Sequence, residues 1–481
     1  MNPALLLGIF GVYTLLLFLI SRFTSRKADD HAFYRGNRRS PWYVVAYGMT
    51  GASLSGVTFL SEPGWVKDTQ FSYMMVVLGY VAGYAVIIAV LLPLYYRMNL
   101  TSIYTWLEKR FGLYAYRTGA SFFILSRLAG VSLRMFLTVY ILYLFVFQYW
   151  NIPFFAVGVL FVMLILLYTF RGGIRTIVWT DTLQTTFMLL AVALSIYLTG
   201  KEMGWSLGDL AGRIRESGYA TVVVTDWTDE RFYLKQFLSG VFIPIVMTGL
   251  DQDMMQKNLS CRNLHAARKN MFVFSIFLLP VNLLFLSLGA VLLLYAQAVG
   301  LEVTETDRLF AQVAVHRLGG VAGIVFVIGL LSAAFSSADG TLTALTTSVC
   351  IDILRLDRRH IPDRDRIRIR YLVHFAVAAL SLLLLLAVKQ LNHQAVIASV
   401  FTVAGYTYGP LLGLYAFGLY SRRAVRDKAV PAIALLSPVI TWLLDSHSQQ
   451  LLCGYNFGFE LLIVNGLITF AGLWLCSTRN N

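Results

Sequence analysis

The sequence is poor in charged residues and in cysteine. Only 13% of its 481 residues are charged, against about 25% in an average soluble domain, which excludes an ordinary soluble enzyme. The four cysteines, Cys261, Cys350, Cys453 and Cys476, are too few and too scattered for a disulfide framework, and none stands in a CxxC or Cys/His metal spacing. Redox and zinc chemistry therefore have no support in the sequence.

Hydrophobic residues make up 58% of the chain and run almost from end to end. No polar stretch is long enough for a second globular unit, so we expect a single transmembrane domain over residues 1–481. A helix needs about 20 apolar residues to cross a membrane. One uncharged run is too long for a single crossing, and we divide it at Asn151–Pro153 because proline favours a turn. The predicted spans are 3–21, 41–65, 71–96, 118–148, 152–170, 176–199, 234–256, 270–297, 318–350, 370–389, 394–420, 429–445 and 457–476.

These thirteen spans predict an all-α integral membrane protein with its ends on opposite sides of the membrane. The formal net charge is +14. If the N-terminus lies outside, the inner segments hold 28 Lys and Arg residues and the outer segments nine. Because basic residues favour the cytoplasmic side, this distribution places the N-terminus outside and the C-terminus in the cytoplasm. It also favours a lipid bilayer, not a nucleic acid, as the partner of the positive charge.

Two spans carry polar or helix-breaking residues at membrane depth. Span 41–65 is rich in Gly and Ser between Gly48 and Gly64, a pattern typical either of close helix packing or of an unwound segment whose carbonyls face an ion or a solute. Span 318–350 carries a dense run of hydroxyl residues around the intramembrane carboxylate of Asp339. Hydroxyl oxygens suit a small alkali or alkaline-earth cation. Asp181 opens span 176–199, where the positive end of the helix dipole alone could favour an acid.

Six motifs, in order along most of the chain, resemble those of the sodium:solute symporter family. They are Ser55–Gly64 (SGVTFLSEPG), Tyr104–Gly112 (YTWLEKRFG), Arg171–Gln184 (RGGIRTIVWTDTLQ), Gly249–Gln256 (GLDQDMMQ), Ser336–Ser348 (SSADGTLTALTTS) and Tyr406–Gly413 (YTYGPLLG). The resemblance implies the LeuT-type fold, in which two five-helix inverted repeats enclose a site near the midplane and rock between two states. The repeats would be 41–199 and 234–420, with an extra N-terminal helix at 3–21 and two C-terminal helices within 429–476.

The resemblance also implies which residues bind sodium. The principal site would use backbone carbonyls of span 41–65, and an Ala carbonyl with two Ser hydroxyls of span 318–350. A second site, found in some members, would use the acid of the Trp-Thr-Asp motif and side chains one turn further along span 318–350. Gly340 departs from this pattern, since those members supply a hydroxyl there. The principal set is Gly51, Leu54, Ala333, Ser336 and Ser337, and the second is Asp181, Ser336 and Asp339.

For the solute, the resemblance points to residues around the break in span 41–65, namely Ser53, Val57, Thr58 and Phe59. Val57 stands where a sugar-transporting member has a carboxylate, which disfavours a hexose.

Two arginines, Arg127 and Arg134, lie within span 118–148, and an intramembrane charge is costly enough to suggest function. Two interpretations remain open: one arginine pairs with a protein acid such as Glu62, or Arg134 binds a substrate carboxylate, as an arginine in this span of sialic acid symporters does.

The family resemblance predicts a sodium-coupled symporter, with Na⁺ as coupling ion and no organic cofactor. It would import a small polar solute by alternating access, such as a carboxylate-bearing sialic acid or another sugar or organic acid. The alternatives are an amino acid, a vitamin or a polyol, and more distantly an ion channel or a non-transporting membrane sensor. No GxxxxGK[ST] loop for ATP occurs. We expect a multi-pass protein of the plasma membrane, the inner membrane in a bacterium, that is not an enzyme and has no evident obligate protein partner.

Overall fold

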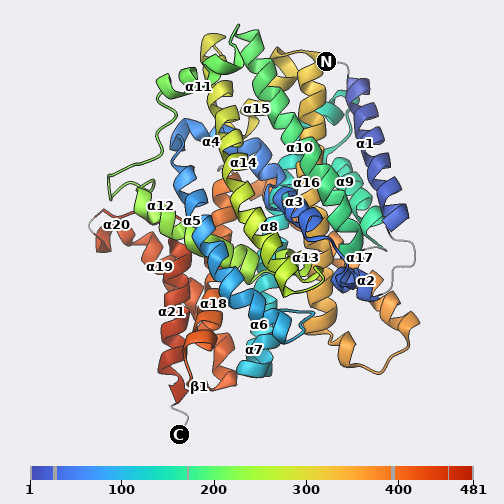
Figure 1. Ribbon diagram of the computed structural model, residues 1–481, viewed down its shortest axis with the longest axis vertical. Helices are drawn as coiled ribbons and strands as arrows, with labels where there is room; N and C mark the ends of the chain where they lie inside the picture. Colours follow the sequence, from blue (N-terminus) through green and yellow to red (C-terminus); the bar gives the residue numbers. More distant parts are fainter. Residues whose placement is uncertain (1–2, 25–29, 171–172, 392–395, 453, 479–481) are drawn as a thin grey trace.

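The computed structural model describes residues 3–24, 30–170, 173–391, 396–452 and 454–478, and they form a bundle of helices (Figure 1). The helices of the N-terminal half are α1 (Pro3–Thr24), α2 (Asp30–Arg35), α3 (Trp42–Ser53), α4 (Gly56–Thr69), α5 (Tyr73–Val86), α6 (Leu92–Arg97), α7 (Thr105–Arg110), α8 (Leu113–Leu142), α9 (Phe154–Thr169), α10 (Ile174–Glu202) and α11 (Leu207–Glu216). Those of the C-terminal half are α12 (Tyr233–Pro244), α13 (Gln252–Leu259), α14 (Leu264–Ala298), α15 (Leu309–Gln312), α16 (Gly320–Ser348), α17 (Asp363–Leu391), α18 (Val396–Tyr420), α19 (Val430–Ser446), α20 (Ser448–Leu451) and α21 (Leu461–Leu475).

Short elements connect or extend these helices. Several long helices contain a π-helical turn: η2 (Ile87–Leu91), η3 (Tyr143–Phe147), η5 (Ile245–Gly249), η7 (Val313–Arg317) and η8 (Val349–Ile353). The 3₁₀ turns are η1 (Gly36–Arg38), η4 (Gln148–Trp150), η6 (Thr306–Arg308), η9 (Leu356–Arg358) and η10 (Asp427–Ala429). Strands β1 (Ala424–Val425) and β2 (Ser477–Thr478) pair antiparallel and join the end of α18 to the end of α21.

Each of the thirteen predicted segments overlaps a described helix or a bent pair of helices. Eight helices are long and apolar enough to cross a membrane, and two bent pairs qualify if each counts as one span. Residues 394 and 395 of the predicted span 394–420, and Arg171 and Gly172 of the third motif, lie outside the described residues. The number of crossings stays a prediction.

The division of the long uncharged run is confirmed. The chain turns at Asn151, whose backbone is left-handed (φ 54°), and Pro153 then precedes α9 in an extended conformation. Proline disfavours a helical conformation of the residue before it, so the helix ends here.

Two pairs of helices are bent, and buried polar groups of the protein lie at the two bends. α3 and α4 meet at an angle of 59°, and α12 with η5 meets α13 at 67°. We call Leu54 and Ser55 the first break, and Leu250 and Asp251 the second break. Each predicted repeat therefore begins with a broken helix. The division of the chain into 41–199 and 234–420 stays a prediction.

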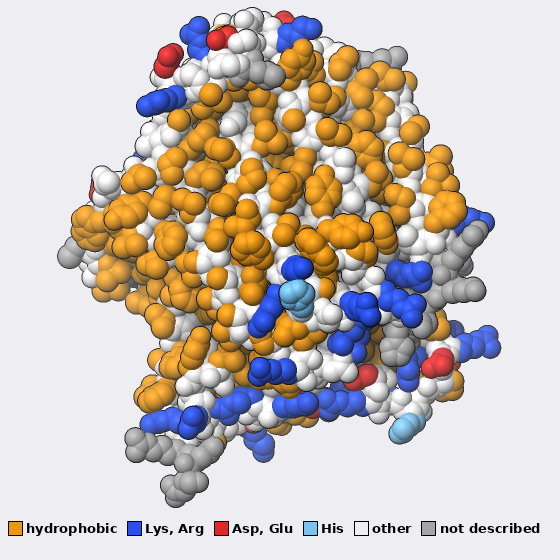
Figure 2. Space-filling view, viewed as in Figure 1, with side chains coloured by type: hydrophobic (Ala, Val, Ile, Leu, Met, Phe, Trp, Pro, Cys, Tyr) orange, Lys and Arg blue, Asp and Glu red, His pale blue; other side chains and the backbone are white. Residues whose placement is uncertain are grey.

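The surface matches a protein surrounded by lipid. Figure 2 shows a broad hydrophobic belt across the viewed face, with Lys and Arg gathered below it. α17, for example, exposes Leu372, Phe375 and Leu383. The start of α1 and the end of α21 lie at opposite ends of the long axis (Figure 1). Lipid tails are as apolar as these side chains, so lipid can cover the belt. The helices satisfy their own backbone hydrogen bonds and therefore need no water there.

Candidate ion and solute sites

The first break leaves carbonyl oxygens unbonded at the centre of the molecule. α3 ends at Ser53, Leu54 and Ser55 are extended, and α4 starts at Gly56. The N–H of Leu54 donates to the Thr50 carbonyl at 3.0 Å. Among the described residues, no hydrogen bond reaches the carbonyl oxygens of Gly51 and Leu54. Unbonded carbonyls at membrane depth are tolerated where they line a cavity or an ion site.

α16 brings the remaining three residues of the predicted principal sodium site to this break. It packs against both α3 and α4, and Ala333, Ser336 and Ser337 are all buried. The five predicted residues thus come from elements that are in contact. Gly51 lies near the end of α3 and Leu54 in the first break, and the other three lie on one stretch of α16. Its role in binding sodium stays a prediction.

Two glycines permit the close packing around the first break. A Cβ atom at Gly51 would overlap the hydroxyl of Thr185 on α10, and one at Gly56 would overlap the hydroxyl of Thr138 on α8. Both features that the Gly-rich pattern of this span allowed are therefore present. The helices pack closely at these glycines, and the chain is unwound between α3 and α4.

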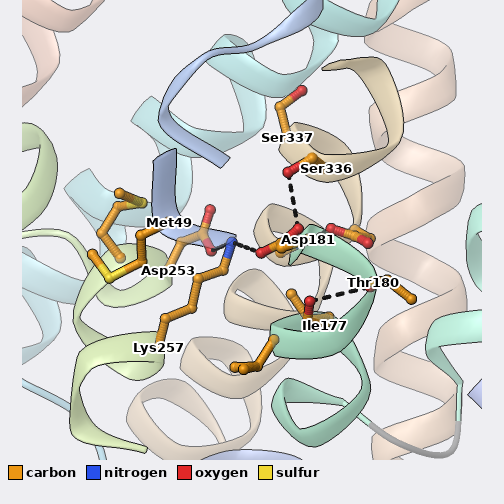
Figure 3. A network of polar contacts seen from close by, with 12 residues as sticks. Met49, Ile177, Thr180, Asp181, Asp253, Lys257, Ser336 and Ser337 are labelled. Atoms are coloured by element: carbon orange, nitrogen blue, oxygen red, sulfur yellow. Dashed lines mark hydrogen bonds and ion pairs between the residues drawn. The ribbon is translucent and has the colours of Figure 1, made fainter. Parts of the chain in front are cut away.

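A buried ionic network lies below the two serines of α16 (Figure 3). The Ser336 hydroxyl donates to Asp181 Oδ1 at 2.9 Å. The ammonium of Lys257, from α13, lies 2.9 Å from Asp181 Oδ2 and 3.6 Å from Asp253 Oδ1. Asp339 accepts a hydrogen bond from the Tyr168 hydroxyl at 2.9 Å. Of the predicted second sodium set, Asp181 and Ser336 are thus in direct contact, and the set stays a prediction.

The interpretation of Asp181 as an acid at a helix end is wrong. α10 begins at Ile174 and has no acidic residue in its first turn. Asp181 lies about two turns further in, beyond the reach of the helix terminus. Its side chain is 1% exposed, so the carboxylate is held by its partners in the core.

A cavity lies beside the first break and contains most of the predicted solute residues. We call it the central cavity. Ser53, Val57, Thr58 and Arg134 lie along its wall. Ser55 and Arg127 also lie on this wall, with five further side chains that could contact a polar solute: Tyr73, Tyr80, Tyr84, Thr248 and Asn282. These five were not predicted from the sequence, although Tyr73, Tyr80 and Tyr84 recur at near-helical spacing within one predicted span.

The central cavity adjoins a second cavity on the predicted outer side. Tyr73 and Phe401 lie on the walls of both, and Glu230, Arg231 and Asp445 also line the second one. These two side chains therefore lie between the central cavity and the predicted outer segments.

Phe59 is a correction to the predicted solute site. It is fully buried and its ring packs against those of Phe285, Phe310 and Phe326. Successive residues of a helix point about 100° apart, so Phe59 faces the core while Val57 and Thr58 face the central cavity.

The two arginines of α8 have different surroundings. Arg127 Nε donates to Asp251 Oδ2 at 2.5 Å, and Arg127 Nη1 lies 4.0 Å from Asp253 Oδ2. Arg134 forms no ion pair with the described residues, and its Nε is buried without a hydrogen-bond partner. Glu62, the expected protein partner, is buried on α4 and pairs with neither arginine among the described residues. Of the two arginines of α8, Arg127 thus pairs with a protein acid, and the acid at hydrogen-bonding distance is Asp251 instead of Glu62.

At the second break, tyrosine hydroxyls of the protein itself donate hydrogen bonds to the backbone carbonyls. Tyr95 donates to the Gly249 carbonyl and Tyr104 to the Leu250 carbonyl, each at 2.9 Å. Tyr408 donates to Asp251 Oδ2 at 2.5 Å. Gly249–Gln256 was recognisable in the sequence as a motif, but the break within it was not predicted, and Lys257 was placed in an inner segment. Two acids inside a predicted span were the signal, because intramembrane charges require partners.

Comparisons with known proteins agree with this architecture. A sequence model of the sodium:solute symporter family matches residues 33–434. The sodium/sialic acid symporter NanT of Aliivibrio fischeri is 22% identical over 92% of this chain and 88% of its own length. The sodium/sialic acid symporter SiaT of Proteus mirabilis is 22% identical over 96% and 93%. The solved structure of a Na⁺-coupled sialic acid symporter, in a substrate-bound outward-open state, superposes with a TM-score of 0.85 at 18% identity, covering 99% of each chain.

The fold and the matched family together define a secondary transporter with a LeuT-like architecture. The chain belongs to the sodium:solute symporter family. It is a multi-pass membrane protein, and sodium-coupled movement of a small solute is its function.

Proposed function

We propose that the chain imports an acidic organic solute together with sodium, and that Arg134 binds the carboxylate of this solute. The observation that carries the proposal is a charged guanidinium on the wall of the central cavity with no ion-pair partner among the described residues. An arginine stays charged in a protein and binds carboxylates through two parallel hydrogen bonds. The similar sodium/sialic acid symporters make a sialic acid the first candidate.

Sodium would bind between the first break and α16, with Gly51 and Leu54 carbonyls on one side and Ala333, Ser336 and Ser337 on the other. The unbonded carbonyls of the first break support this position. Five oxygens with little net charge suit a monovalent ion that must bind and leave in each cycle. The ion and the solute would share the first break, since Ser53 lies on the cavity wall and Leu54 follows it.

Alternating access would expose this pair of sites to each side in turn. We retain thirteen crossings in two inverted repeats with the N-terminus outside, in the plasma membrane. The basic residues below the hydrophobic belt in Figure 2 favour this orientation. The second cavity, which adjoins the central cavity at Tyr73 and Phe401, is lined by residues of the predicted outer segments and supports access from that side.

The test is uptake into proteoliposomes with an imposed sodium gradient. Sialic acids, monocarboxylates, neutral hexoses, polyols, amino acids and vitamins would be compared at equal concentration. We expect sodium-driven uptake of a carboxylate-bearing solute and little of its neutral analogue. Sodium-driven uptake of a neutral solute, in preference to every acid tested, would contradict the role given to Arg134.

A further inference from the structure

The place predicted for a second sodium ion contains a charged group of the protein itself. Lys257 is 1% exposed, and its ammonium lies 2.9 Å from Asp181 Oδ2 (Figure 3). Asp181 Oδ1 accepts from the Ser336 hydroxyl at 2.9 Å. Both carboxylate oxygens of Asp181 therefore have partners from the protein. A buried ammonium requires such partners, because removing a charge from water is costly unless another charge compensates it.

Gly340 provides the space for this ammonium. A Cβ atom added at Gly340 would lie 2.7 Å from Lys257 Nζ and 2.7 Å from Asp253 Oδ1. A side chain at position 340 and the ammonium in its present position exclude one another. The family resemblance described above implies that members with a second sodium site have a hydroxyl residue at this position. The departure from the family pattern and the buried lysine thus have one physical explanation.

The other carboxylate of the predicted second set, Asp339, also has partners within the protein. It accepts hydrogen bonds from the Tyr168 hydroxyl at 2.9 Å and from the Gly340 N–H at 2.6 Å. The neighbouring Asp253 accepts from the Thr341 hydroxyl at 3.0 Å on one oxygen, and its other oxygen lies 3.6 Å from the Lys257 ammonium. A sodium ion bound to Asp181 would have to lie next to the ammonium, and two positive charges at contact repel strongly in a buried site.

We propose that Lys257 replaces the second sodium ion, so that one sodium ion accompanies each solute molecule. The ammonium neutralises Asp181 as a second ion would, but it is tethered to α13 and is not transported. This inference rests on the sodium coupling proposed above and adds the number of ions. Lys257 is a positioning residue in this scheme, because it acts through Asp181 and Ser336 on the principal site.

The experiment counts sodium bound to the purified full-length chain. Equilibrium binding of radioactive sodium, together with the sodium dependence of binding, gives the number of ions per chain and the Hill coefficient. For the natural chain we expect about one ion and a Hill coefficient of about one. Ser337→Ala should then weaken the binding of this one ion about tenfold, which corresponds to about 1.4 kcal/mol. About two ions per chain in the natural protein, or a Ser337→Ala protein that binds sodium with unchanged affinity, would overturn the proposal.

A double variant tests the replacement directly. Lys257→Met with Gly340→Ser removes the ammonium and supplies a hydroxyl, and we expect about two bound ions and a Hill coefficient above one. Lys201→Met, at the exposed end of α10, is the matched control and should still bind about one. A folded double variant that binds only one ion would contradict the idea that the lysine excludes the second. If the double variant does not fold, the count in the natural chain still decides.

Failure of the proposed function would look different. In that case the natural chain would bind no sodium, or would transport its solute equally well in a sodium-free buffer, whatever the number of sites. A count of two ions with intact sodium-driven uptake would reject only the role of Lys257.

Discussion

The two breaks differ in how their backbone carbonyls are satisfied. At the first break, no hydrogen bond from the described residues reaches the carbonyl oxygens of Gly51 and Leu54. At the second break, tyrosine hydroxyls bond the carbonyls of Gly249 and Leu250. Both interruptions leave the same backbone groups without helical partners. The first break thus has oxygens available for an external ligand, whereas the second is satisfied by the protein itself.

The two arginines of α8 differ in the same way as the two breaks, since one has a protein partner and the other has none among the described residues. Both arginines of α8 lie on the wall of the central cavity, but Arg134 has no ion-pair partner among the described residues, whereas Arg127 is paired with Asp251 at the second break. Two arginines on one helix can therefore have opposite roles. The unpaired arginine is available to a solute, and the paired one holds α8 against the start of α13. Four substitutions test this contrast, from the largest expected effect to the smallest.

The largest effect is expected from Asp251→Asn, because it leaves the Arg127 guanidinium buried with only the more distant Asp253. Removing one partner of a buried ion pair costs about 3–5 kcal/mol. We expect a marked loss of thermal stability in detergent and less folded protein in the membrane. Asp68→Asn, at an exposed acid, is the control and should leave the melting temperature unchanged. An Asp251→Asn protein as stable as the natural one would show that the pair does not hold the second break.

Arg134→Lys should raise the half-saturation constant for the solute. A lysine keeps the charge but loses the bidentate hydrogen bonds. Hydrogen bonds to charged groups contribute about 1.5–3 kcal/mol, so we expect the constant to rise by about one to two orders of magnitude while folding is retained.

The measurement is uptake against concentration of the solute identified by the screen, with the exposed Arg317→Lys as the matched control. Unchanged affinity in a folded Arg134→Lys protein would remove the arginine from the solute site. Loss of stability as large as that of Asp251→Asn would instead indicate a structural role, and would contradict the difference drawn between the two arginines.

Ser337→Ala should weaken sodium binding and leave the solute site intact at saturating sodium. The ion loses one of five proposed oxygens, and a methyl group cannot replace it. We expect the sodium concentration for half-maximal uptake to rise about tenfold, which corresponds to about 1.4 kcal/mol. Ser332→Ala, five residues earlier on α16, should change it little. Equal sodium dependence of the two variants would exclude Ser337 as a ligand.

The smallest effect is expected from Tyr104→Phe, which removes one hydroxyl from the second break. The Leu250 carbonyl would then be buried without its hydrogen bond, at a cost of about 1 kcal/mol. A modest fall in melting temperature, with sodium dependence unchanged, is the expected result, and Tyr43→Phe at an exposed tyrosine serves as the control. A change in sodium affinity larger than that of Ser337→Ala would reverse the roles given to the two breaks.

Much of the architecture could be predicted because it depends on properties that are local in the sequence. Apolar runs gave all thirteen segments, and the Gly/Ser-rich stretch indicated the first break. The second break could not be found in this way, since Leu250 and Asp251 lie in a stretch without a comparable Gly/Ser pattern. Its bonding partners, Tyr95, Tyr104 and Arg127, are contributed by distant parts of the chain.

Alignment with a family gives positions along a helix, but contacts depend on the direction of each side chain and on where the helix begins. Phe59 was assigned to the solute site although it points into the core. For Asp181 a place at a helix end was one of two interpretations, although α10 starts about two turns earlier. Lys257 was counted with a basic inner segment because only the folded chain brings it to Asp181.

The tethered ammonium of Lys257 has an electrical consequence. A charge that remains on the protein is carried back in every cycle, so it moves no net current across the membrane. One sodium ion with one monocarboxylate then transfers zero charge, and the membrane potential neither drives nor opposes uptake. With a second sodium ion, a potential of 100 mV would contribute about 2.3 kcal/mol per cycle. A lysine in this position therefore makes accumulation of such a solute depend on the sodium concentration gradient alone.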